Sequence, residues 1–103
     1  MPRSFALILT LLAAPAFAAS PAQIQSGQNL ARQYCSECHV VAPSPSKGWT
    51  DAPAFDAIAN NPSNTAAKLA QFIEQPHMHM MNTGRPAPEA AALAAYILSL
   101  KGK

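Results

Sequence analysis

A Cys-x-x-Cys-His motif over residues 35–39 constrains this chain more than any other feature. Cys35 and Cys38 are its only cysteines among 103 residues, and His39 follows the second directly. Two thiols at this spacing lie on one turn of chain, so each can form a thioether with one of a porphyrin's two vinyl groups. The adjacent histidine then lies beneath the ring and supplies a nitrogen to the iron. The motif predicts one covalently attached haem c with His39 as proximal axial ligand.

Three other chemistries use the same residue types. Cys35 and Cys38 can form a redox disulfide of the thioredoxin kind, although that motif belongs in a βαβ context and no strand pattern precedes it here. They can be half of a zinc site completed by His39, His77 or His79. They can also form a plain structural disulfide, which is common in secreted domains. An export signal, the adjacent histidine and an all-helical pattern together favour haem attachment.

The N-terminus has the features of a secretory signal peptide over residues 1–18. Arg3 gives a positive start, and residues 5–14 form an apolar run that is too short to span a bilayer as a helix. Residues 16–18, Ala-Phe-Ala, are a small-x-small cleavage site. We expect cleavage after Ala18 or one residue later, and export to the periplasm. An uncleaved membrane anchor is the alternative reading.

The mature chain, residues 19–103, is expected to form a single domain. It keeps six basic and five acidic residues, so its net charge is about +1 before any cofactor is counted. No basic run is present, which argues against nucleic acid or an anionic membrane as a partner. A chain this short often needs a cross-link or a bound cofactor to stabilise its fold, and an attached haem would supply an apolar body for helices to pack around.

Apolar residues recur at helical spacing and no stretch alternates, so we expect an all-α fold. Helices are expected over residues 21–34, 55–59, 65–74 and 88–101, joined by proline-rich loops. Ser20 is the expected N-cap of the first helix, and Asn64 or Ser63 that of the third. Gly102 is a C-cap candidate for the last helix.

The loop over residues 76–82, Pro-His-Met-His-Met-Met-Asn, concentrates possible sixth ligands for the iron. A methionine opposite histidine raises the haem potential, whereas a second histidine lowers it. Only one side chain can occupy the axial position, so the others pack in the loop or form a separate surface copper site. The candidates are His77, Met78, His79, Met80 and Met81.

These features together resemble the class I cytochrome c family over essentially the whole mature chain. In that family a glycine precedes the first motif cysteine by eight positions, as Gly27 does here, and packs against an aromatic of the last helix, which Tyr96 matches. The resemblance implies crossing N- and C-terminal helices, with the haem enclosed by helices and loops. The family's aromatic on the first helix is replaced by Ala31, so Leu30 or Tyr34 must fill that space.

The resemblance also assigns the sixth ligand. The loop is similar to the Pro-His-x-x-Met-x-Asn segment of a small bacterial subgroup, whose methionine lies sixteen positions before the tyrosine of the last helix. Met80 and Tyr96 have that spacing, so the distal ligand role falls to Met80. Where the subgroup usually has prolines, this chain has Met78, His79 and Met81, which leaves ligand switching open.

Other pocket residues follow from the same resemblance. A proline carbonyl on the proximal side accepts a hydrogen bond from the axial histidine; Pro53 is the best match and Pro43 the runner-up. Trp49 either packs on the haem and reaches a propionate or anchors its loop. Tyr96 is counted with the haem pocket.

The function implied is one-electron transfer by a monomeric, non-enzymatic carrier with redox protein partners, whose identity the sequence does not reveal. No stable membrane insertion is expected after signal cleavage. The alternative is a haem-based gas sensor or peroxidase-like protein with a labile sixth ligand, in which His77 or His79 acts as a distal group. A haem-free metal-binding or disulfide protein is the third reading.

Overall fold

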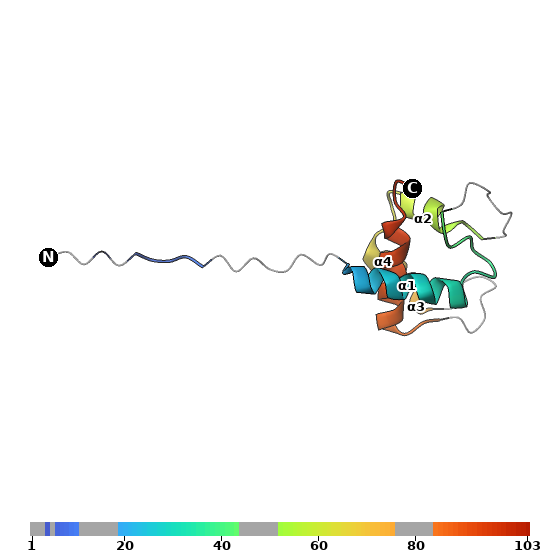
Figure 1. Ribbon diagram of the computed structural model, residues 1–103, viewed down its shortest axis with the longest axis horizontal. Coiled ribbons are helices and arrows are strands. Elements are labelled where there is room, and N and C mark those ends of the chain that lie inside the picture. The colour runs from blue at the N-terminus through green and yellow to red at the C-terminus, as the bar shows by residue number, and fades with distance from the viewer. Residues whose placement is uncertain (1–3, 5, 11–18, 44–51, 76–83) are drawn as a thin grey trace.

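Four helices make up the domain, and no strand occurs among the residues that the structure describes. The structure is a computed structural model, and it describes residues 4, 6–10, 19–43, 52–75 and 84–103. The all-α prediction is confirmed, and Figure 1 shows α1 running across α4. The elements are α1 (Pro21–Tyr34), α2 (Phe55–Asn60), α3 (Ala66–Glu74) and α4 (Ala87–Ser99).

The first helix begins and ends where its sequence predicts. The Ser20 hydroxyl accepts a hydrogen bond from the backbone N–H of Gln23 at 3.1 Å, and Pro21 occupies the first helical position. The last residue of α1 is Tyr34, and Cys35 is its C-cap. The Cys-x-x-Cys-His motif therefore begins directly at the end of α1.

The start of α3 differs from the prediction. Thr65, rather than Asn64 or Ser63, is the N-cap, and its hydroxyl accepts from the N–H of Lys68. The Asn64 amide is used elsewhere, because it donates to the carbonyl of Ile58 at 3.0 Å. That bond ties the start of α3 to α2, and it uses the side chain that would otherwise cap the helix.

The last helix also ends earlier than predicted. Its C-cap is Leu100, whose N–H bonds to the carbonyls of Ile97 and Leu98. Gly102 lies two residues beyond the cap with φ of 82°, a left-handed conformation that favours glycine. Its N–H donates to the Asn60 side chain at 2.9 Å, which ties the C-terminal turn to the end of α2.

The packing of α1 on α4 depends on Gly27. A Cβ built on this glycine would lie 2.0 Å from the backbone oxygen of Ala92 and 2.7 Å from Cβ of Tyr96. Only a residue without a side chain allows the two helices to approach this closely. Gly27 and Tyr96 thus form the helix contact that the resemblance to class I cytochromes c implies.

The small residue at position 31 is fully buried in the same region. Leu30 packs against the core cluster, whereas Tyr34 is 37% exposed. Of the two residues expected to compensate for Ala31, Leu30 is therefore the one that packs against the core. The core itself is formed mainly by α4, with α1, α2 and α3 packed around it.

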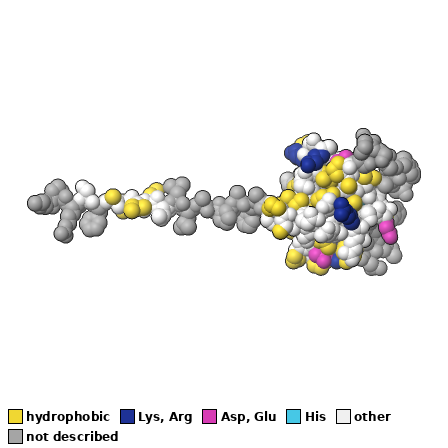
Figure 2. Space-filling model, viewed as in Figure 1, with side chains coloured by type: hydrophobic (Ala, Val, Ile, Leu, Met, Phe, Trp, Pro, Cys, Tyr) yellow, Lys and Arg dark blue, Asp and Glu magenta, His cyan; other side chains and the backbone are white. Residues whose placement is uncertain are grey.

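The described residues before residue 19, which are 4 and 6–10, are not part of this core. Leu7, Ile8 and Leu9 are 75–87% exposed, and Figure 2 shows apolar side chains of this segment outside the helical body. Within the described ranges, no helix is long and apolar enough to cross a membrane.

We predict that Gly27→Ala destabilises the protein by about 1–3 kcal/mol, because the added methyl group collides with a backbone carbonyl that cannot move without shifting α4. Urea unfolding measures the effect. Ser26→Ala, on the exposed face of the same helix, is the control. Intrinsic helix propensity alone would make Gly27→Ala stabilising by about 1 kcal/mol, so an increase in stability would contradict the close contact.

Candidate functional site

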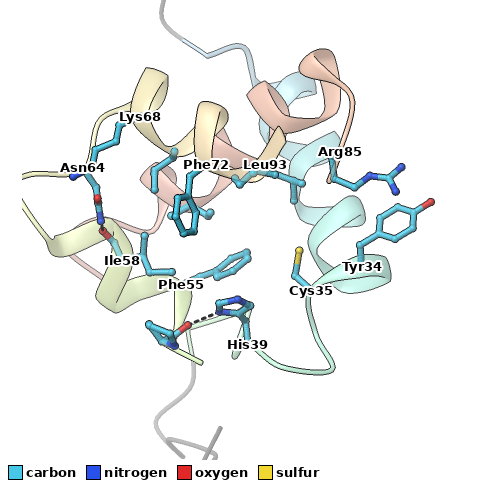
Figure 3. Close-up of a pocket in the computed structure, with 14 residues that line it drawn as sticks. Tyr34, Cys35, His39, Phe55, Ile58, Asn64, Lys68, Phe72, Arg85 and Leu93 are labelled. Carbon is cyan, nitrogen blue, oxygen red and sulfur yellow. Dashed lines mark hydrogen bonds between the residues drawn. The ribbon is translucent and has the colours of Figure 1, made fainter. Parts of the chain in front are cut away.

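The Cys-x-x-Cys-His motif folds as a turn that continues from α1. The backbone N–H groups of Cys38 and His39 both donate to the carbonyl of Cys35, at 3.2 and 2.9 Å. The N–H of Cys35 in turn donates to Ala31 within α1. The turn is therefore fixed to the helix, and the His39 side chain points into the domain (Figure 3).

His39 is oriented by a proline carbonyl. Its Nδ1 lies 2.6 Å from the backbone oxygen of Pro53 (Figure 3). A carbonyl can only accept, so Nδ1 must carry the proton, and in the neutral ring the lone pair is then on Nε2. Of the two candidate prolines, the structure pairs His39 with Pro53 and not with Pro43. The free Nε2 is the nitrogen that a metal could bind.

The segment after His39 is held from two further sides. The N–H of Phe55 donates to the carbonyl of Val40 at 2.9 Å, and the Tyr96 hydroxyl donates to the carbonyl of Val41. The rings of His39 and Phe55 lie 5.2 Å apart at a tilt of 51°. Contacts from α2 and α4 thus fix the position of the imidazole.

A cavity of about 460 Å³ opens beside this histidine. Its volume lies within the range of protein ligand pockets. Side chains from α2, α3 and α4 give it an apolar wall, and Phe72 on that wall is 56% exposed. The apolar lining residues are Phe55, Ile58, Leu69, Phe72, Ile73, Leu93 and Ile97.

Polar side chains lie at two ends of the cavity. Asn64 and Lys68 lie at one end, and Tyr34 and Arg85 at the other, near Cys35 (Figure 3). The two charged groups that line the cavity are thus separated by its apolar wall. This arrangement suits a flat apolar molecule with polar edges.

The two cysteines differ in their surroundings. Cys35 is half-buried and lines the cavity, whereas Cys38 is exposed and is not among the lining residues. Both are free thiols in the structure. Burial raises the pKa of the Cys35 thiol, and the positive charge of Arg85 acts in the opposite direction.

Tyr96 does not line the cavity. It is buried between α1 and α4, with its ring 6.4 Å from that of Phe55, which does line it. Burial raises the pKa of the Tyr96 phenol, against smaller opposing effects of Gln28 and Arg32. Tyr96 is connected to the site by its hydrogen bond to Val41 and by the packing of its ring near Phe55.

Several predicted site residues lie outside the described residues, and their roles stay predictions. Trp49 falls within residues 44–51, and Met80 with all its competitors within residues 76–83. The surface copper site predicted as an alternative also falls there. Among the described residues, no group of three or more His, Cys, Asp or Glu side chains could hold a metal ion.

The residues present fit a covalently bound haem. Cys35 offers a thiol at the cavity wall, and Cys38 lies one turn further along the chain. His39 presents Nε2 with its other nitrogen already bonded, an arrangement typical of metal-ligating histidines. The apolar walls match a porphyrin face.

Sequence reasoning did not identify the residues at the cavity ends as parts of the site. Arg85 and Glu89 have i,i+4 spacing, which predicts an ion pair, so this one contact at the end of the cavity could have been predicted from the sequence. The approach of Arg85 to Tyr34 joins residues 51 positions apart, and no local pattern indicates it.

Comparison with known proteins identifies relatives of this chain. The family model described as cytochrome c oxidase, cbb3-type, subunit III matches residues 22–97. The chain is 35% identical over 99 residues to cytochrome c-552 of Bradyrhizobium diazoefficiens, which covers 96% of this chain and 94% of that protein. No solved structure matches it significantly.

We predict that Tyr96→Phe lowers the stability by about 1 kcal/mol, because the hydroxyl bond to Val41 is lost. The substitution should also make the free energy of unfolding fall less steeply as the pH rises above 10. Above the ordinary tyrosine pKa of 10.0 the unfolded chain releases the phenol proton while the folded chain retains it, so stability falls as pH rises in the wild type.

Urea unfolding from neutral pH to above 10 measures this slope. Tyr34→Phe removes the same group from a half-exposed ring and is the control. Equal alkaline slopes in Tyr96→Phe and wild type would show that the phenol is not shielded.

Proposed function

This chain belongs to the family of small class I c-type cytochromes, which bind haem c covalently and transfer electrons, and from that premise we propose that it is a periplasmic, monomeric one-electron carrier. A single haem c is held by thioethers to Cys35 and Cys38, with His39 and Met80 as axial ligands. The sequence has no cysteines for a second attachment site.

One observation carries the proposal. His39, its Nδ1 bonded to Pro53, and Cys35 belong to the same apolar cavity. A thiol and an oriented imidazole at the wall of one cavity are what covalent attachment and proximal ligation require. A thioredoxin-like disulfide or a zinc site would have no use for so large an apolar space.

When bound, haem c supplies reversible one-electron chemistry at its iron. The protein's own part is to hold the imidazole and exclude water. Pro53 fixes the orientation of the His39 ring and holds the proton on Nδ1, which leaves the lone pair on Nε2. Leu69, Leu93 and Ile97 cover the apolar interior, and the exposed Phe72 contributes to the rim. None of these groups has to move for an electron to pass.

Met80 is proposed as the distal ligand because its spacing to Tyr96 and its Pro-His-x-x-Met-x-Asn context match the bacterial subgroup. A methionine paired with histidine raises the reduction potential of the haem. Such a carrier would have a six-coordinate iron in both oxidation states and no open position for a substrate, which is why we propose a carrier and not an enzyme.

The periplasmic location rests on the N-terminal segment. The apolar run over residues 5–14, the preceding Arg3 and the cleavage site at residues 16–18 support export and removal of the first 18 or 19 residues. Electrostatic steering by the mature domain should be weak, because its net charge is about +1. Docking to redox proteins would then rely on the apolar rim around the cavity.

Redox titration of the purified holoprotein, followed optically, tests the function. We expect the absorption spectrum of a c-type haem, one reversible one-electron transition, and no rapid binding of carbon monoxide to the reduced protein at neutral pH. Rapid binding would favour the gas sensor or peroxidase-like alternative, because it requires a labile sixth ligand.

Met80→Ala should remove the weak methionine-to-iron charge-transfer band of the oxidised protein and lower its reduction potential. Near-infrared and visible absorption of the oxidised form measure the band. Met78→Ala, two residues away in the same loop, is the matched control and should keep it. If the band persists in Met80→Ala, another residue is the ligand.

A further inference from the structure

Arg85 occupies the end of the cavity nearest Cys35 and is held there by three contacts. Its guanidinium carbon lies 3.9 Å from the centroid of the Tyr34 ring, at the end of α1. Its Nε donates to the Glu89 carboxylate at 2.7 Å, on the first turn of α4. Its backbone N–H donates to the carbonyl of Ile73 at 3.1 Å, near the end of α3. The side chain is therefore held between α1 and α4, and the backbone from which it extends is bonded to α3.

Glu89 both fixes this cation and partly neutralises it. The hydrogen bond between the two raises the pKa of Arg85 above its ordinary value, so the guanidinium is charged at any working pH. Arg85 and Cys35 both line the cavity, whereas Glu89 is not among its lining residues. The cation of the pair therefore belongs to the cavity wall, where its guanidinium lies over the Tyr34 ring, and the anion belongs to a residue outside the lining.

The charge of Arg85 reaches the cavity wall. Arg85 lines the cavity together with Cys35, and both lie at the same end of it (Figure 3). Lys68, the other cation among the described lining residues, lies at the opposite end (Figure 3), where its ammonium group donates to the carbonyl of Ser63 at 3.5 Å. An apolar lining screens charge poorly, so a fixed cation at the wall acts on any charge in the cavity more strongly than it would in water.

We propose that Arg85 and Glu89 form a charge pair that sets the reduction potential of the haem. The oxidised iron carries one more positive charge than the reduced iron. Arg85 therefore favours the reduced form, and Glu89 limits that preference. This inference depends on the proposed function, because it requires a redox-active iron in the cavity.

The test compares redox titrations of Arg85→Gln and Glu89→Gln with that of the wild type. At the wild-type midpoint, Arg85→Gln should lower the ratio of reduced to oxidised protein about threefold and Glu89→Gln should raise it about threefold, shifts of about 30 mV in opposite directions. Both shifts should shrink at high salt, because the pair is partly exposed.

Two further variants separate charge from structure. Arg85→Lys keeps the charge and loses the planar stacking on Tyr34, so its midpoint should stay closer to the wild type than that of Arg85→Gln. Lys101→Gln removes a positive charge from an exposed turn outside the cavity and should leave the midpoint unchanged. If Arg85→Gln fails to retain haem, the upward shift in Glu89→Gln still decides the question.

The proposal is overturned if Arg85→Gln and Glu89→Gln shift the midpoint in the same direction, as a purely structural role predicts, or if neither shift exceeds that of Lys101→Gln. Failure of this proposal can be distinguished from failure of the proposed function. A wild-type protein without a haem spectrum would refute that function, whereas intact spectra without opposite shifts refute only the charge pair.

Discussion

The close approach of α1 and α4 at Gly27 is the contact on which the site depends. Because Gly27 has no side chain, the backbone of α1 lies directly against Ala92 and Tyr96 of α4. The same helix ends at Tyr34, so its placement also fixes the turn that carries both cysteines. Displacing α1 from α4 would move Cys35 relative to the wall on the other side of the cavity.

From that contact, a chain of interactions leads to the histidine. Tyr96, packed at Gly27, holds the carbonyl of Val41, and the adjacent Val40 accepts from the start of α2. Pro53, just before α2, fixes the ring of His39. The imidazole is thus oriented by groups from both ends of the chain, although the motif that contains it is local. The crossing of α1 and α4 and the orientation of His39 are therefore connected by one series of contacts, although the residues involved lie far apart in the sequence.

Local chemistry explains what the sequence could predict. Ser20 and Pro21 start α1 where expected, since their capping is a property of adjacent residues. The bond between His39 and Pro53 was expected only through resemblance to a family. The N-cap of α3 was predicted wrongly because the Asn64 amide has a partner in α2 that no local pattern reveals. The packing of Arg85 on Tyr34 was not predicted for the same reason, because it joins the end of α1 to the segment before α4, which is distant in the sequence.

The central claim is that both cysteines carry one haem in a processed chain, and the intact mass of the purified mature protein tests it most directly. The account predicts a chain that begins at residue 19 or 20, carries the added mass of one haem, and has no thiol free to react with an alkylating reagent. The mass of the polypeptide alone, with two alkylated thiols or a Cys35–Cys38 disulfide, would contradict it.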